Sequence, residues 1–186
     1  GHAWSRLRHR HVDADVVVPI PDSGVPAALG YAQQTGIPFE LGIIRNHYVG
    51  RTFIEPEQRI RALGVKLKHS ANAGVIRGKR IVLIDDSVVR GTTSKKIVQL
   101  MYEAGAKEVH MRISSPPITH PDYYGIDTPR KKDLLAANMD VDAMRQFMGA
   151  DSLAFLSVDG IYRSVGIDAR DPRAPQFTDH CFTGEY

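Results

Sequence analysis

Two adjacent carboxylates, Asp85 and Asp86, directly follow the apolar run Arg80–Ile84, which reads RIVLI. A short run of β-branched and apolar residues that ends in acidic residues is typical of a buried parallel strand. In open α/β sheets, ligands bind outside the carboxyl ends of such strands. The sequence therefore predicts that this acidic pair lies at a ligand-binding edge, where its oxygens accept hydrogen bonds from hydroxyl groups.

A small turn follows the acids and leads into a predicted helix. The turn contains Gly91, which permits close backbone approach, and Thr92 and Thr93 begin the helix. Free N–H groups of such a turn and helix start can hold a phosphate, and the hydroxyls add donors. The whole window, IVLIDDSVVRGTT, thus predicts a sugar-phosphate site. The alternative, in which the acids cap a helix and the threonines fill a turn, does not account for all these features in one window.

A long polar segment, Arg45–Lys68, separates the two halves of the predicted domain. It is rich in basic residues and is broken by Gly50, Pro56 and Gly64. A segment of this length inside a compact domain is usually functional. We expect a flexible lid loop here, the alternative being a plain excursion of the chain.

The elements that must position these groups alternate along the chain. Helix-like segments, Val25–Gln34 and Thr93–Ala104, separate three strand candidates, which are Asp15–Ile20, Arg80–Ile84 and Glu108–Ile113. This alternation predicts an α/β domain with a central, mostly parallel sheet flanked by helices.

After residue 130 the pattern changes to short elements. We expect helices at Lys131–Ala137 and Val141–Met148, with Asp140 as the N-cap of the second. An edge strand at Ala154–Ser157 and a helical turn at Asp159–Val165 follow. The predicted division is an N-terminal extension or tag remnant at 1–12, a core at 13–130, and a C-terminal helical segment and tail at 131–186.

The composition narrows the functional class. The chain has 186 residues, of which 42% are hydrophobic and 24% charged, as in a soluble globular protein. Its net charge is +3. The basic residues are mostly scattered along the sequence and have no aromatic residues interleaved with them, so we expect no nucleic-acid partner. No apolar run approaches a membrane span and no secretory signal is present, so we expect no membrane association. The single cysteine, Cys181, fits a reducing cytoplasm.

The window IVLIDDSVVRGTT resembles the phosphoribosyl pyrophosphate (PRPP) motif of type I phosphoribosyltransferases, and its form DDSxVRGTT resembles the glutamine PRPP amidotransferase family in particular. Other segments match that family in order. They are Val18–Gly24 (VPIPDSG), Asn46–Ile54 (NHYVGRTFI) and Tyr124–Thr128 (YGIDT). The resemblance implies the type I phosphoribosyltransferase fold.

The resemblance also implies a role for each matching position. Asp85 and Asp86 would contact the ribose hydroxyls and, with Ser23, hold Mg²⁺. Asp22, Ser23 and Gly24 would form a turn against the pyrophosphate, although PDSG alone also fits an ordinary turn. The residues that would cradle the 5′-phosphate are Ser87, Val88, Val89, Arg90, Gly91, Thr92 and Thr93. Those that would act from the lid are Arg45, His47, Tyr48 and Arg51, of which we assign catalytic roles to Arg45, Tyr48 and Arg51.

The implied reaction is the displacement of pyrophosphate from PRPP by ammonia, which gives 5-phosphoribosylamine, the first step of de novo purine synthesis. The family further implies a homo-oligomer that purine nucleotides inhibit. Its members also carry a glutaminase domain that begins with a cysteine nucleophile. This chain begins at Gly1, so we expect that half to be absent and glutamine-dependent activity to be missing.

Some family members hold an iron–sulfur cluster on cysteines. Here Asp122 and Thr178 stand at two of those positions and only Cys181 remains, so we expect no cluster. Two other functions fit parts of the pattern. A PRPP-sensing regulator would lack the intact PDSG and NHYVGRTFI segments and would usually add a nucleic-acid-binding domain. A nucleobase phosphoribosyltransferase would need a hood that stacks a base.

Overall fold

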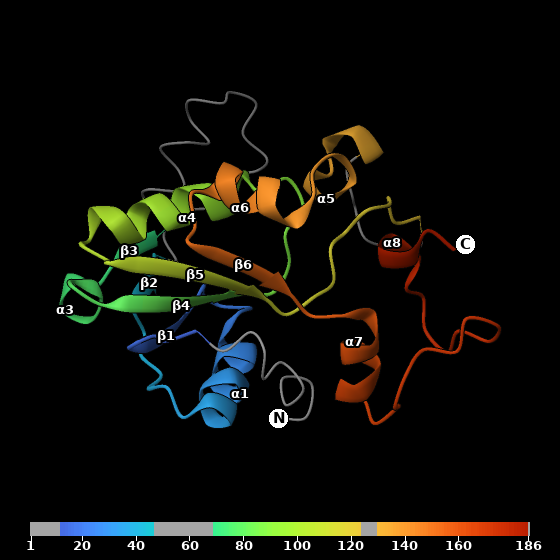
Figure 1. Ribbon diagram of the computed structural model, residues 1–186, viewed down its shortest axis with the longest axis horizontal. Helices are drawn as coiled ribbons and strands as arrows, with labels where there is room; N and C mark the ends of the chain where they lie inside the picture. Colours follow the sequence, from blue (N-terminus) through green and yellow to red (C-terminus); the bar gives the residue numbers. More distant parts are fainter. Residues whose placement is uncertain (1–11, 47–68, 124–129, 186) are drawn as a thin grey trace.

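The structure is a computed structural model that describes residues 12–46, 69–123 and 130–185. Within these residues a four-stranded sheet has the order β1-β4-β5-β6. Its strands are β1 (Val16–Pro19), β4 (Arg80–Asp85), β5 (Glu108–Ile113) and β6 (Ser152–Phe155), and all of its pairings are parallel (Figure 1). The carboxyl ends of the strands therefore lie at one edge, as the predicted site requires.

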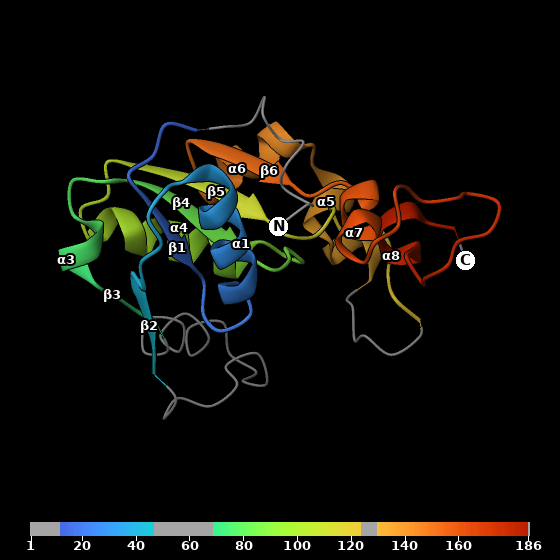
Figure 2. The same cartoon turned by 90° about the horizontal axis from the view of Figure 1, so that it is seen from below.

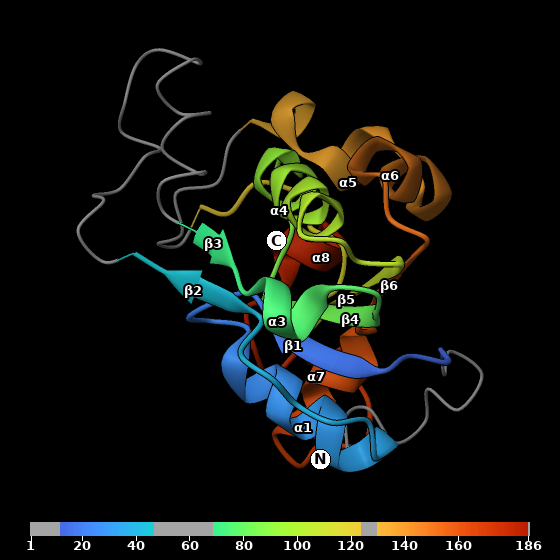
Figure 3. The same cartoon turned by 90° about the vertical axis from the view of Figure 1, so that its left-hand side faces the viewer.

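Helices cover both faces of this sheet. The helix α1 (Val25–Thr35) lies on one face, and α4 (Thr92–Glu103) and α6 (Val141–Met148) lie on the other, as Figure 3 shows in an end-on view. The predicted α/β architecture, a mostly parallel sheet flanked by helices, is confirmed.

Alternate residues of β4 build the two cores. Ile81 and Leu83 pack on the side of α4 and α6, whereas Val82 and Ile84 pack on the side of α1. All four side chains have no exposed surface. Because burying an aliphatic side chain of this size contributes roughly 1.5–3 kcal/mol, the strand that delivers the acidic pair is firmly held.

A second, two-stranded sheet was not predicted. Its strands β2 (Ile43–Arg45) and β3 (His69–Ala71) run antiparallel, and α3 (Ala73–Ile76) follows them. Arg45 pairs with His69 in the register, so these two residues face each other at the two ends of the segment 47–68. Except for Arg45 and Asn46, the predicted lid lies outside the described residues.

The C-terminal part differs in detail from the prediction. In place of one helix at 131–137, the structure has η4 (Lys131–Asp133) and α5 (Leu135–Asn138). Between them Leu134 is extended and fully buried, which breaks the helix. The predicted edge strand begins two residues earlier, as β6, because Leu153, Ala154 and Phe155 are the residues that enter the core.

The helices α7 (Val158–Ser164) and α8 (His180–Thr183) lie at the end of the molecule away from α3, as Figures 1 and 2 both show. The predicted capping role of Asp140 is confirmed, since its side chain accepts a hydrogen bond from Ala143 N at 2.8 Å. Among the described residues, no helix combines the length and apolarity needed to cross a bilayer.

Candidate functional site

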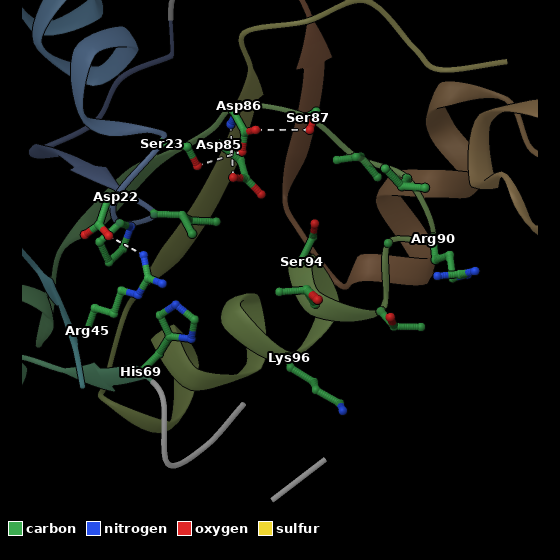
Figure 4. A pocket seen from close by; sticks show the side chains of 17 residues that line it. Asp22, Ser23, Arg45, His69, Asp85, Asp86, Ser87, Arg90, Ser94 and Lys96 are labelled. Atoms are coloured by element: carbon green, nitrogen blue, oxygen red, sulfur yellow. Dashed lines mark hydrogen bonds and ion pairs between the residues drawn. The ribbon is translucent and has the colours of Figure 1, made fainter. Parts of the chain in front are cut away.

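A pocket of about 780 Å³ opens where the loops after β1 and β4 meet the start of α4 (Figure 4). The predicted residues that line it are Asp22, Ser23, Arg45, Asp85, Asp86, Ser87, Val88, Val89, Arg90, Gly91, Thr92 and Thr93. The structure therefore brings together segments that lie far apart in the sequence.

The Asp86 carboxylate joins the two loops of this pocket. Its Oδ1 accepts a hydrogen bond from Ser23 Oγ at 3.0 Å, and its Oδ2 accepts one from Ser87 Oγ at 3.2 Å. Asp86 is otherwise exposed. It is thus a charged acceptor that is held in place by two hydroxyls and still open to a ligand.

Asp85 has a different environment, although it is the next residue. It is the last residue of β4, and only 7% of its surface is exposed. Burial, and then the neighbouring Asp86 carboxylate, raise the pKa of Asp85 well above its usual range. Its Oδ1 accepts a hydrogen bond from Asp86 N at 3.0 Å. A cation or a hydroxyl donor in the pocket would favour the ionised form of this carboxylate.

The start of α4 lines the pocket. Gly91 is its N-cap, and no side chain caps the helix. The first helical bond found there is donated by Lys95 N to Gly91 O at 2.9 Å. The N–H groups of Thr92, Thr93 and Ser94, together with the positive end of the helix dipole, therefore suit a bound phosphate.

Two glycines shape this edge for different reasons. Gly91 has a φ of 71°, and an added Cβ would lie 2.5 Å from Leu135 Cδ2. Gly24 has an ordinary helical φ of −71°, but an added Cβ would lie 2.6 Å from Ile84 O and 2.7 Å from Ile20 O. Unlike Asp22 and Ser23, Gly24 is not among the pocket-lining residues. The missing side chain lets α1 start close against β4.

Arg45 reaches the pocket from β2 and forms an ion pair with Asp22. Their side chains are 32% and 59% exposed, so both remain accessible to a ligand. This pair ties the root of the segment 47–68 to the loop after β1. The other predicted lid residues, His47, Tyr48 and Arg51, lie outside the described residues.

Other pocket-lining residues were not predicted. They are Ile20, Pro21, His69, Ser94 and Lys96. Ser94 and Lys96 follow directly from the helix that begins at Thr92, so extending the motif by one turn would have found them. His69 has no such local signal, because only its register opposite Arg45 brings it to the pocket.

The donor set of the pocket suits a magnesium ion that is shared with a substrate. In the described ranges, no group of three or more His, Cys, Asp or Glu side chains could hold a metal without further ligands. Mg²⁺ is usually bound by one or two carboxylates together with waters and substrate phosphates. Asp85 and Asp86, with the Ser23 hydroxyl beside them, meet that requirement.

The positions that resemble iron–sulfur ligands in other proteins make different contacts here. Asp122 Oδ2 lies 3.4 Å from Nε2 of the buried His180. Cys181 is buried, and burial raises the pKa of its thiol. Because a cluster of this kind needs several thiolates, the residues present do not fit one.

Comparisons with known proteins agree with this geometry. The family model for the phosphoribosyl transferase domain matches residues 3–115. An amidophosphoribosyltransferase of Rhizobium etli is 70% identical over 176 residues, which are 94% of this chain and 36% of that protein. Amidophosphoribosyltransferase 1 of Arabidopsis thaliana, a chloroplastic protein, is 57% identical over 94% of this chain and 30% of its own length. The chain thus spans about a third of the length of these curated relatives.

A solved structure gives the same result in three dimensions. The glutamine PRPP amidotransferase from B. subtilis, complexed with ADP and GMP, matches with a TM-score of 0.81 and 55% sequence identity. The match covers 94% of this chain and 38% of that one. These findings confirm the family resemblance drawn from the sequence motifs.

Proposed function

We propose, from the premise that this chain belongs to the phosphoribosyl transferase domain family, that it binds PRPP and transfers the phosphoribosyl group to ammonia. The products are 5-phosphoribosylamine and pyrophosphate. This is the reaction expected of an amidophosphoribosyltransferase, the class to which its 70% and 57% identical relatives belong.

One observation supports the proposal most strongly. In a single pocket, the paired acids Asp85 and Asp86 lie between the start of α4 and the Asp22–Arg45 ion pair (Figure 4). The two carboxylates, which can accept hydrogen bonds from hydroxyl groups, therefore have the start of α4 on one side and the Arg45 guanidinium on the other. PRPP has the matching order of groups, with a 5′-phosphate, two ribose hydroxyls and a pyrophosphate.

Each group of the chain has a defined task in this proposal. The amides and hydroxyls of residues 87–93 bind the 5′-phosphate, helped by the N–H of Ser94, and Asp85 and Asp86 accept hydrogen bonds from the ribose hydroxyls. Arg45 exchanges the Asp22 carboxylate for the pyrophosphate and stabilises the charge that develops as the pyrophosphate leaves. The bound orientation exposes C1 of the ribose to ammonia, and no side-chain nucleophile is needed.

Mg²⁺ is the proposed cofactor, held by Asp85, Asp86 and Ser23. When bound, it supplies Lewis-acid stabilisation of the pyrophosphate leaving group. We assign the exclusion of water to the lid, and catalytic roles to its residues Tyr48 and Arg51 together with Arg45.

The wider properties of the protein are proposals as well. We propose a cytoplasmic, homo-oligomeric enzyme that purine nucleotides inhibit. The nucleotides ADP and GMP in the matching B. subtilis structure support that inhibition. We also propose a division of the chain into an N-terminal extension at 1–12, a core region at 13–130 and a C-terminal segment at 131–186.

The test is an assay of pyrophosphate release from PRPP and Mg²⁺. We expect release with ammonium ions, and none with adenine, guanine, hypoxanthine or orotate. Asp86→Asn is the matched control for background hydrolysis. Release that depends on a nucleobase would replace this function with that of a nucleobase phosphoribosyltransferase. Binding of PRPP without turnover of any acceptor would favour the PRPP-sensing regulator.

A further inference from the structure

His69 is a polar side chain in an unusual position. It begins β3, only 6% of its surface is exposed, and yet it lines the pocket. The imidazole is therefore fixed at the pocket wall, largely shielded from solvent.

The register of the small sheet explains how His69 reaches the pocket. In β2 and β3, Arg45 lies directly opposite His69. Opposite residues of an antiparallel pair project from the same face, with their Cβ atoms about 4.5–5.5 Å apart. Both side chains therefore point into the pocket together, and Figure 4 shows the His69 ring beside the Arg45 guanidinium.

Arg45 and His69 lie at the end of the pocket opposite the start of α4. Figure 4 places Asp22, Arg45 and His69 together on the side away from Arg90, with Asp85 and Asp86 between the two groups. The cradle at residues 87–93 takes up the opposite side. The two ends thus use different donors, which are backbone amides at one end and cationic or imidazole side chains at the other.

We propose that His69 is a pyrophosphate-binding residue, which donates an imidazole N–H to the pyrophosphate that Arg45 also binds. This inference rests on the proposed function and refines it, because it assigns the two ends of the pocket to different parts of PRPP. A neutral imidazole has one N–H to donate, and a protonated imidazole has two. The register of β2 and β3 sets the imidazole next to the guanidinium, within reach of the same anionic group.

The experiment uses the two halves of PRPP as separate probes. Inorganic pyrophosphate with MgCl2 reports on the Arg45–His69 end, and ribose 5-phosphate reports on the cradle. Dissociation constants are measured by calorimetry for the wild-type chain, His69→Leu and His69→Gln. We expect His69→Leu to weaken pyrophosphate binding at least about tenfold, which is typical for the loss of a hydrogen bond to a charged group. Ribose 5-phosphate binding should change less than about twofold. The amide of His69→Gln should restore part of the loss.

His110→Gln is the matched control. This histidine is also buried, with 8% exposure, but it lies on β5 and bonds to Ser152 and Glu108 away from the pocket. The same substitution there should leave both dissociation constants unchanged, whatever it does to thermal stability.

A second measurement does not depend on whether the His69→Leu variant folds. In NMR spectra of the wild-type chain, the His69 ring resonance, assigned by its absence in His69→Gln, should shift with Mg²⁺-pyrophosphate and not with ribose 5-phosphate. The proposal is overturned if His69→Leu weakens both probes equally, or neither, or if the ring resonance ignores pyrophosphate. If the wild-type chain binds neither pyrophosphate nor ribose 5-phosphate, that result would contradict the proposed function itself, and this inference with it.

Discussion

Asp85 and Asp86 share a peptide bond but not an environment. Asp86 is exposed and receives the hydroxyls of Ser23 and Ser87, whereas Asp85 is buried at the end of β4. The end of the strand accounts for this difference, since Asp85 is the last residue of β4 and Asp86 lies in the loop that follows it. Burial raises the pKa of Asp85, so its ionised form opposes folding until a cation or a hydrogen-bond donor compensates the charge.

This leads to a prediction for the stability of Asp85→Asn. The pKa of Asp85 is raised well above 3.8 in the folded state, mainly by burial, so folding favours its protonated form. The contribution of Asp85 to the free energy of unfolding is complete below its unfolded-state pKa and is lost as the pH rises through its folded-state pKa. The neutral isostere should therefore raise the melting temperature at pH 7 by about 2–4 °C, for roughly 1 kcal/mol. Thermal melts from pH 7 down to pH 3 check this. The gain should vanish at the acidic end, and a gain that persisted there would contradict the explanation.

Gly91 carries a prediction about the cradle. Alanine at this position must adopt a left-handed conformation, which costs roughly 1–2 kcal/mol, and its Cβ would collide with Leu135. We expect Gly91→Ala to lower the free energy of unfolding by at least about 1 kcal/mol. Because the helix start would shift, it should also weaken ribose 5-phosphate binding. Urea denaturation and calorimetry measure the two effects.

Gly30→Ala is the control for that substitution. Gly30 lies inside α1, and an added Cβ would meet nothing within 4 Å. In a helix interior alanine is favoured over glycine by roughly 0.5–1 kcal/mol, so this variant should be slightly more stable. Equal destabilisation of the two variants would count against a special role for the Gly91 conformation.

At the scale of elements, the strands and helices whose sequence pattern is contiguous could be predicted from the sequence. β1, β4 and β5 were predicted within two residues at each end, because runs such as VVVP and RIVLI are buried on both faces and leave little choice of structure. The residues of the predicted cradle line one pocket because they are contiguous in the sequence. The small sheet of β2 and β3 could not be predicted in this way, since IIR and HSA are three residues each and pair across 23 intervening positions. His69 was missed for the same reason.

The C-terminal elements α7 and α8 depend on one buried acid. Asp179 accepts hydrogen bonds from Tyr162 Oη at 2.8 Å and from Arg170 Nε at 2.5 Å. Although burial alone would raise the pKa of Asp179, the hydrogen bonds from Arg170 and Tyr162 hold it below its usual value. The side chains of Asp179 and Arg170 are 8% and 9% exposed, so the pair is buried.

We expect Asp179→Asn to destabilise the chain by about 3 kcal/mol at pH 7, because the Arg170 charge would lose its buried partner. Because the pKa of Asp179 is lower in the folded state, the ionised carboxylate stabilises the fold. This contribution to the free energy of unfolding is complete above the unfolded-state pKa of about 3.8 and is lost as the pH falls through the folded-state pKa. The gap between wild-type and variant should therefore narrow below about pH 3.8. Denaturation curves at pH 7 and pH 3 measure this gap. A gap that is equal at both would show that the ion pair is not its cause.

At the scale of the whole molecule, the C-terminal part is continuous with the core. β6 pairs with β5 over four positions, and Met144 and Met148 of α6 enter the same core as Ile97 and Met101 of α4. The pocket lies at the sheet edge where β1 and β4 end, so its walls depend on this whole arrangement.

The most direct test of the account is a calorimetric titration of the chain with PRPP in the presence and absence of MgCl2. We predict saturable binding of one PRPP per chain that requires Mg²⁺, and no detectable binding to a variant in which Asp85→Asn and Asp86→Asn are combined. That variant should remain folded, since both substitutions keep the size of the side chain. Unchanged affinity in the folded double variant, or a wild-type chain that does not bind PRPP, would contradict the assignment of this pocket.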